Sequence, residues 1–291
     1  NIEEAAITLV NGGIMAVRMP LLFDLMEKVD AGNAQGEIYL TDIVGVGRSQ
    51  NCSIACEVTD EDEMMGVNSR ADLARAEALL QAQLRVAAMA SGVTLQAPDT
   101  VFLSADSVIE RDVIIEPHVV IGAGCHIGEG SVIKAFSHIE GAWLGACCVI
   151  GPYARLRPGT EAADGVKIGN FVETKNVNLG DGAKANHLTY LGDAEIGAAA
   201  NIGAGTITCN YDGFNKSKTI IGKNAFIGSN TALVAPIAIG DGAIIGAGST
   251  MSADVGADDI AFTRASVETR QKAAATFRDA KKAISADRKA K

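Results

Sequence analysis

The sequence predicts a parallel β-helix, in which short strands stack into a triangular prism. Between Leu103 and Met251, aliphatic residues recur at every sixth position over long runs, and a glycine or another small residue often follows them. A period of six fits neither an α-helix, which repeats near 3.6 residues, nor a free-standing strand, which repeats at 2. Hexads are typical of β-helices, where three of them make one coil. The small residue lets the chain turn a corner at which a side chain would collide.

The hexads keep their register over long runs, with two shifts. A one-residue slip follows Ile139, and Ile202 and Ile221 are separated by 19 residues where 18 would keep register. The second shift contains the polar and aromatic residues 208–216, so we expect a projecting loop there, and such loops commonly carry function. The predicted inward-facing positions are Leu103, Ile109, Ile115, Ile121, Ile127, Ile133, Ile139, Leu144, Ile150, Leu156, Ala162, Ile168, Ile221, Ile227, Leu233, Ile239, Ile245 and Met251.

Residues 1–67, in front of the repeat, predict a small α/β region. We expect strands over 7–10, 14–17 and 52–58, and helices over 21–29 and 40–47. A piece of this size is marginal as an independent domain, and the sequence opens without Met. The pattern therefore indicates the C-terminal remnant of a larger α/β domain in a truncated chain.

Residues 68–92 predict a connecting helix between this region and the repeat. Asn68 and Ser69 are good N-caps for a helix over 70–90. The β-helix is expected over 93–256, and a tail with a helix over 257–291. The expected apolar stripe of the connecting helix is Leu73, Ala76, Leu80, Leu84 and Ala87.

The composition excludes several classes of protein. Apolar residues make up 48% and charged residues 21% of the 291 residues, as in a folded globular chain. A net charge of −10 argues against a general nucleic-acid binder. There is no signal peptide and no apolar run near the roughly 20 residues that cross a bilayer, so we expect a cytoplasmic protein. Six cysteines match no zinc or redox spacing, and Cys125 and Cys147 are expected to be buried thiols.

His187 is the candidate general base. The hexad rhythm loosens from about 174 to 190, and this histidine stands there among Asn, Thr, Tyr and Asp residues. A histidine in a repeat is often only a solvated side chain on the coil face. Imidazole is nevertheless the side chain best suited to removing a proton near neutral pH.

Arg157 and Lys175 are candidate ligands for an anion. They lie one 18-residue coil apart, so their charged ends could converge on one group. A forked guanidinium beside an ammonium suits a phosphate. The alternative is that both are ordinary solvent-facing charges.

Three stretches of the chain are long and specific: IGPYARLRPG at 150–159, HLTYLGD at 187–193 and NIGAGTITCNYDG at 201–213. They resemble one family, the bifunctional bacterial N-acetylglucosamine-1-phosphate uridyltransferases / glucosamine-1-phosphate N-acetyltransferases. NAQGEIYLTD at 33–42 resembles the family's late uridyltransferase segment, and GVNSR at 66–70 resembles its end. The resemblance covers essentially the whole chain.

This resemblance implies a left-handed β-helix, a homotrimer, and acetyl transfer from acetyl-CoA to the 2-amine of glucosamine 1-phosphate. It implies that His187 is the base, that Arg157 and Lys175 grip the sugar phosphate, and that Tyr190 and Asn201 contact the sugar. It further implies acetyl-CoA and active-site contacts at Ala204, Asn210, Tyr211, Ser229, Ala247 and Arg264.

The resemblance also implies a second activity for the parent protein, a Mg²⁺-dependent uridyl transfer. Asn11 matches a UDP-sugar contact, and Asn68 matches a contact to Mg²⁺ and the UDP-sugar. The family's glycine-rich nucleotide loop and its metal-binding aspartate would lie upstream of Asn1. We therefore expect this fragment to keep only the acetyl transfer.

Two alternative classes remain open at this stage. One is another hexapeptide-repeat acyltransferase, which would act on a different amino sugar, a serine or an antibiotic. The other is a β-helix without acyltransferase activity, such as a zinc-dependent carbonic-anhydrase-like relative, a spacer or a regulatory subunit. The pair Arg157 and Lys175 and the loop at 210–216 disfavour the first class, and the spacing of the histidines disfavours a zinc site.

Overall fold

A computed structural model describes residues 8–30 and 36–290. The chain divides into two compact units, Asn1–Leu79 and Leu80–Lys291. Among the described residues, no helix is both long and apolar enough to span a membrane.

The first unit contains short helices and no strand within its described residues. Its elements are α2 (Met19–Met26), the 3₁₀ turn η1 (Leu40–Asp42), α3 (Ile43–Ser49) and the 3₁₀ turn η2 (Glu61–Met64). Leu25 and Ile43 are its buried apolar side chains. The two helices were predicted, with somewhat different bounds.

The strands predicted in this unit are wrong where the structure describes them. Residues 8–10, 14–17 and 52–58 have no regular secondary structure, while Ile7 lies outside the described residues. Val10 is 87% and Ile14 78% exposed. A strand needs a neighbour for its backbone N–H and C=O groups, and an alternating sequence pattern does not supply one.

The predicted connecting helix is confirmed as α4 (Arg70–Ala90). Ser69 Oγ accepts a hydrogen bond from Asp72 N at 3.1 Å, and Asp72 Oδ2 accepts one from Ser69 N at 2.8 Å, which forms a capping box. The predicted apolar stripe is only partly right, because Leu73 and Leu80 are exposed. Gln81 is the buried side chain of α4, since its amide pairs with both backbone groups of Leu103 at the open end of the first coils.

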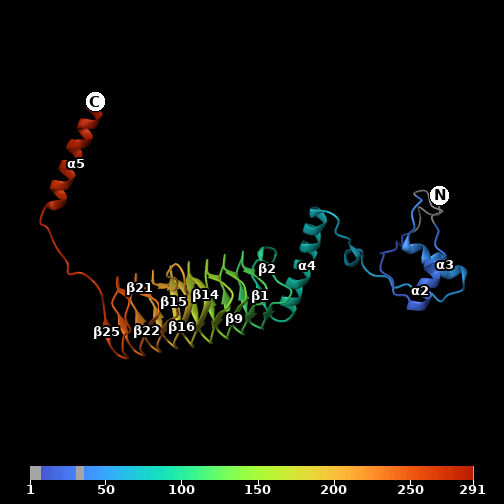
Figure 1. Cartoon of the computed structure of the whole chain (residues 1–291), viewed down its shortest axis with the longest axis horizontal. Helices are drawn as coiled ribbons and strands as arrows, with labels where there is room; N and C mark the ends of the chain where they lie inside the picture. Colours follow the sequence, from blue (N-terminus) through green and yellow to red (C-terminus); the bar gives the residue numbers. More distant parts are fainter. Residues whose placement is uncertain (1–7, 31–35, 291) are drawn as a thin grey trace. The chain divides into compact units, whose positions relative to one another are not determined.

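The second unit is a parallel β-helix with three faces, whose coils stack from β1 to β25 in Figure 1. The first face contains β1 (Thr94–Leu95), β4 (Ile114–Ile115), β7 (Val132–Ile133), β10 (Val149–Ile150), β13 (Lys167–Asn170), β15 (Lys184–His187), β17 (Asn201–Ile202), β20 (Phe226–Ile227), β23 (Ile244–Ile245) and β25 (Ile260–Ala261). The second contains β2 (Phe102–Leu103), β5 (Val120–Ile121), β8 (His138–Ile139), β11 (Arg155–Leu156), β18 (Ile207–Cys209), β21 (Ala232–Val234) and β24 (Thr250–Met251). The third contains β3 (Val108–Ile109), β6 (His126–Ile127), β9 (Ala142–Leu144), β12 (Thr160–Ala162), β19 (Thr219–Ile221) and β22 (Ile237–Ile239).

Two longer strands bend from the second face onto the third. They are β14 (Glu173–Leu179) and β16 (Tyr190–Ile196), and they pair with each other along both faces. Their bends coincide with the polar interruption of the hexads. A further helix, α5 (Ala273–Ala290), confirms the helix predicted for the tail.

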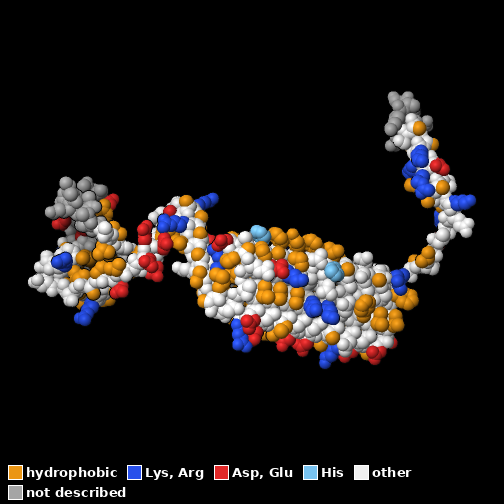
Figure 2. All heavy atoms as spheres, turned by 180° about the vertical axis from the view of Figure 1, so that it is seen from behind, with side chains coloured by type: hydrophobic (Ala, Val, Ile, Leu, Met, Phe, Trp, Pro, Cys, Tyr) orange, Lys and Arg blue, Asp and Glu red, His pale blue; other side chains and the backbone are white. Residues whose placement is uncertain are grey.

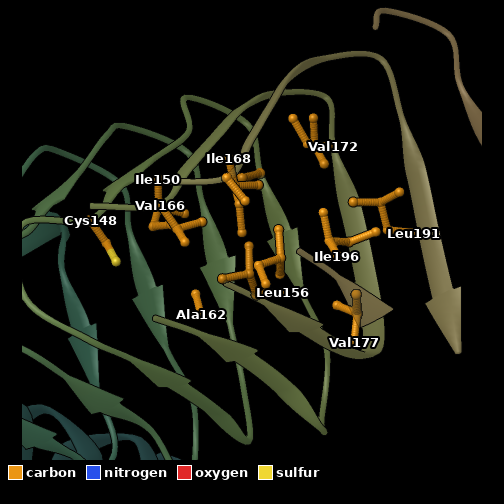
Figure 3. Packing of buried hydrophobic residues seen from close by; sticks show 14 of the residues in the cluster. Cys148, Ile150, Leu156, Ala162, Val166, Ile168, Val172, Val177, Leu191 and Ile196 are labelled. Atoms are coloured by element: carbon orange, nitrogen blue, oxygen red, sulfur yellow. The ribbon is translucent and has the colours of Figure 1, made fainter. Parts of the chain in front are cut away.

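The hexad residues form the core of the prism, as predicted. Ile115, Ile133, Ile150 and Ile168 are fully buried in successive coils, and every other predicted position is buried or, for Ile109, partly buried. Figure 3 shows four of these residues, Ile150, Leu156, Ala162 and Ile168, with their side chains inside the coils. Burying an aliphatic side chain of this size stabilises the fold by about 1.5–3 kcal/mol, so the stacked column supplies most of the driving force.

The coil that contains the second register shift is longer than the 19-residue step from Ile202 to Ile221 indicates. Ile202 pairs with Ile227, and Ile196 pairs with Ile221, so the coil that contains the loop is 25 residues long rather than 18. The extra residues form the predicted loop between β18 and β19. One expectation about the cysteines is wrong: Cys147 is exposed at a corner with φ +57°, and its neighbour Cys148 is the buried thiol.

Candidate functional site

The second face carries the polar residues that interrupt the repeat. Strand alternation buries Leu156, Thr174 and Leu191. It turns the residues next to them outward, in register across three coils: Arg157 follows β11, Lys175 lies in β14, and Gly192 lies opposite Lys175 in β16. The prediction that Arg157 and Lys175 stand one coil apart at the same register is therefore confirmed.

His187 ends β15 at the corner between the first and second faces. It is exposed, and its Nδ1 lies 2.7 Å from Oδ1 of Asn170, its register partner in the preceding coil. An amide oxygen only accepts hydrogen bonds, so this contact places the imidazole proton on Nδ1. Nε2 is then the nitrogen that carries the lone pair of a general base.

Three cations meet at the opposite edge of the second face. Lys216, from the inserted loop, lies close to Lys175, and this contact lowers the pKa of Lys175. The charge of Arg157 also lowers the pKa of Lys175, whereas the charge of Asp193 raises it. Arg157 also holds an ion pair with Glu173 at 2.9 Å. Like charges gathered in this way repel one another, and an anionic ligand would relieve the repulsion.

Tyr190 lies between His187 and the cations. Its hydroxyl rests over Gly192, where an added Cβ would collide with it. The absence of a side chain at Gly192 therefore lets the phenol ring extend along the face toward Lys175. The second face and the inserted loop thus place an imidazole, a phenol and three cations in a row.

The inserted loop begins at a buried residue and then projects outward. Asn210 is 9% exposed, and its backbone oxygen accepts a hydrogen bond from Ser217 N at 2.9 Å, which closes the root of the loop. The backbones of Tyr211 and Lys216 form an antiparallel β-bridge, and Tyr211 is 61% exposed. Asp212 accepts hydrogen bonds from two loop amides and shapes the tip.

Small residues continue the corner beyond His187. Ala204, Ser229 and Ala247 follow β17, β20 and β23 at equivalent positions, and the first is half-buried while the others are exposed. The guanidinium of Arg264 lies beside Gly246 and over the ring of Phe262, 5.4 Å from its centroid. The corner therefore runs past small side chains from His187 at one end to Arg264 at the other.

The remaining predicted residues lie apart from this row. Asn201 is on the first face, in register with Lys184 and Phe226, so a single chain does not bring it to Tyr190. Asn11 and Asn68 belong to the first unit, and both are exposed. Within the described residues, no group of three or more His, Cys, Asp or Glu side chains is placed to hold a metal ion.

Three residues near the row were not predicted from the sequence. Lys216 was seen only as part of a loop, and Asn170 and Asp193 were not assigned a role. Asn170 lies 17 residues before His187, so a search at the regular 18-residue spacing misses it. None of the three residues lies in the loosened stretch from about 174 to 190, so that stretch does not point to them.

Two family models of hexapeptide repeats match parts of the β-helix. Residues 218–253 match the hexapeptide repeat of succinyl-transferase, and residues 106–141 match the bacterial transferase hexapeptide of six repeats. The fold is the left-handed parallel β-helix that was predicted. Among solved structures, LpxA from Acinetobacter baumannii has a TM-score of 0.39 and 16% identity, covering 58% of this chain and 71% of that one.

Curated relatives match over nearly the whole chain. A bifunctional protein GlmU from Sphingopyxis alaskensis is 53% identical over 277 residues, which cover 95% of this chain and 61% of the relative. Another from Zymomonas mobilis subsp. mobilis is 52% identical, with 96% and 62% covered. The chain thus spans about three fifths of the length of these relatives.

Proposed function

Because this chain is a homologue of the bifunctional GlmU proteins, we propose that it is a glucosamine-1-phosphate N-acetyltransferase. It moves the acetyl group of acetyl-CoA to the 2-amine of glucosamine 1-phosphate. The product, N-acetylglucosamine 1-phosphate, serves the synthesis of UDP-N-acetylglucosamine and hence of peptidoglycan and lipopolysaccharide. The observation that carries the proposal is the row on the second face, with His187 at one edge and three cations at the other.

The row fits the two functional ends of the substrate. An amino-sugar phosphate has a nucleophilic amine at one end and a dianion at the other. Arg157, Lys175 and Lys216 offer the charged hydrogen bonds that a phosphate accepts. Tyr190 lies between the two ends, where the sugar ring would sit.

His187 acts as the general base in this proposal. As the amine nitrogen attacks the thioester carbonyl, the C–N bond forms and Nε2 accepts the proton that the amine loses. The C–S bond then breaks, and the sulfur of coenzyme A leaves as a thiol with that proton. Asn170 keeps Nδ1 protonated, so that Nε2 stays available throughout. General-base catalysis of this kind contributes about 10²–10⁴-fold to the rate.

Acetyl-CoA would lie along the corner that continues from His187. The small side chains of Ala204, Ser229 and Ala247 leave room for an extended pantetheine arm. Arg264, at the far end, suits the phosphates of the coenzyme. Asn210 and Tyr211, at the root of the inserted loop, would contact the acetyl end.

The complete site would need more than one chain. Asn201 lies on the first face and Tyr190 on the second, so both reach one sugar only if the faces belong to neighbouring subunits. A ladder of stacked rings also lies exposed at the corner that holds His187. It consists of His118, Phe136, Tyr153 and Phe171, with centroids 4.8–5.2 Å apart. Figure 2 shows hydrophobic side chains gathered along one flank of the β-helix. These features support a homotrimer.

The parent protein would also be a Mg²⁺-dependent uridyltransferase. Asn11 and Asn68 would contribute UDP-sugar contacts there, and Asn68 a contact to the metal. Neutral amides are weak ligands for Mg²⁺, which prefers carboxylates and phosphates. These two residues would therefore act only together with acidic groups supplied by other parts of that domain.

A thiol-release assay with acetyl-CoA tests the proposed function directly. Glucosamine 1-phosphate should support rapid release of coenzyme A, and unphosphorylated glucosamine, serine and a UDP-linked amino sugar should not. Faster release with one of these other acceptors would identify a different hexapeptide-repeat acyltransferase. No release with any acceptor would leave the β-helix without the proposed activity.

A further inference from the structure

We propose that Asp193 is a positioning residue for the three cations, because its carboxylate fixes the root of the inserted loop through Asn210 and offsets the charge of Lys175 and Lys216. The inference rests on the proposed function for its kinetic test, and on the structure alone for its second test. Asp193 itself would not touch the substrate.

Asp193 lies between two polar side chains, those of Asn176 and Asn210, at the corner between the second and third faces. Asn176, one coil earlier, donates Nδ2 to Oδ1 of Asp193 at 2.6 Å. Asn210, one coil later, donates Nδ2 to Oδ2. An ionised carboxylate only accepts hydrogen bonds, so both amides must present their NH₂ groups to it.

This arrangement determines how Asn210 is held. Its side chain is buried, and its backbone oxygen closes the loop root by accepting from Ser217 N. With its NH₂ group directed to Asp193, the side-chain oxygen of Asn210 points the other way. The carboxylate therefore fixes the residue from which the loop with Lys216 departs.

The charge of Asp193 is as important as its hydrogen bonds. Partial burial raises the pKa of Asp193, but the amides of Asn176 and Asn210 and the ammonium groups of Lys216 and Lys175 outweigh it, so the pKa lies below its ordinary value. In turn, Asp193 raises the pKa of Lys175 against the larger lowering by Lys216. It thus helps Lys175 to stay charged.

The other charged groups around Lys175 do not replace this effect. Arg157, from the preceding coil, is a further cation, and Glu173 of β14 already pairs with it at 2.9 Å. Tyr190, from the following coil, is a neutral phenol. Beyond the loop, Lys218 pairs with Glu195. Asp193 is therefore the carboxylate that offsets the repulsion between the positive charges of Lys175 and Lys216.

Asp193 also differs from the structural carboxylates of the repeat. Asp164 accepts a backbone hydrogen bond from Ala146 N in the preceding coil at 2.7 Å, and Asp241 accepts one from Lys223 N at 2.7 Å. Such contacts hold one coil to another. Asp193 is bonded instead to two side-chain amides beside the cations.

The test compares Asp193→Asn with Asp164→Asn in the full chain. Asn tolerates the left-handed backbone that Asp193 adopts at φ +48°, so the fold should be kept. Asp193→Asn should raise the KM for glucosamine 1-phosphate about tenfold, the scale of one charged hydrogen bond. The KM for acetyl-CoA should stay within about twofold, and Asp164→Asn should change neither value. Equal changes for both substrates, or an unchanged KM for the sugar phosphate, would overturn the inference.

A second readout does not depend on catalysis. NMR titration of ¹³C-labelled lysine side chains, assigned with Lys175→Arg, should show a lower pKa for Lys175 in Asp193→Asn than in the unmodified chain. An unchanged titration would contradict the inference even if the enzyme were active. If the unmodified chain shows no acetyl transfer but the lysine titration shifts as expected, the proposed function fails and the positioning role of Asp193 stands.

Discussion

Nδ1 of His187 lies 2.7 Å from Oδ1 of Asn170, its partner one coil earlier. This contact fixes both the orientation of the ring and the nitrogen that is free to act as a base. Without it, the imidazole could rotate or present the protonated nitrogen to the substrate.

Replacing Asn170 by Ala should therefore lower the turnover number by roughly 10-fold or more, the scale expected for an orienting partner. The loss should be smaller than that of His187→Ala, and the KM for each substrate should change little. Asn170→Asp keeps an acceptor for the Nδ1 proton and should retain more activity than Asn170→Ala. Equal activity of Asn170→Ala and the unmodified chain would show that the contact has no role in catalysis.

Removing a cation from the row should weaken binding of the sugar phosphate. Arg157→Ala or Lys175→Ala each deletes one charged hydrogen bond to the phosphate, worth about 1.5–3 kcal/mol or roughly 10- to 150-fold in affinity. Isothermal titration with glucosamine 1-phosphate should detect this change, whereas binding of acetyl-CoA should be retained. If binding of both ligands falls equally, the cations serve the structure rather than the phosphate.

The activity should also fall at alkaline pH because of Lys175. Lys216 lowers the pKa of Lys175, so this side chain loses its charge at a lower pH than an ordinary lysine. The cation binds phosphate only below that pKa, and kcat/KM for glucosamine 1-phosphate should therefore decline as the pH rises through it. Arg remains charged at these pH values, so Lys175→Arg should move the decline to higher pH. A pH profile that is identical in the two proteins would rule out Lys175 as the titrating group.

The ring ladder should be part of a subunit contact. Phe136 and Tyr153 have φ of +61° and +56°, a conformation that Asn tolerates. The double variant Phe136→Asn, Tyr153→Asn should therefore keep its fold but dissociate at concentrations where the unmodified chain is trimeric, and it should lose activity. Ile220→Asn, on the third face and similarly exposed at 44%, is the matched control. Sedimentation equilibrium that finds an active monomer in the unmodified chain would contradict this prediction.

The sequence predicts the β-helix well because its core has one simple rule. Every coil must bury an aliphatic residue such as Ile150 or Ile168, and that requirement repeats along the chain. Arg157 and Lys175 were predictable for the same reason, since a regular coil places them in register. His187 was visible because it interrupts the pattern.

The remaining parts of the site and the first unit depend on features that do not repeat along the sequence. Lys216 reaches Lys175 only because the coil containing the loop is longer than its neighbours, and the lengths of irregular coils do not reveal where a loop folds back. The residues around Asn201 do not indicate on which face of the β-helix it lies. In the first unit, residues 52–58 alternate as a strand would, but strand formation depends on partners that a local pattern does not specify.

The turnover number of His187→Ala tests the central claim most directly. With glucosamine 1-phosphate and acetyl-CoA both saturating, the account predicts a loss of ~10²-fold or more, in a variant whose circular dichroism and oligomeric state match the unmodified chain. A correctly folded His187→Ala variant with turnover near that of the unmodified chain would show that His187 is not the base.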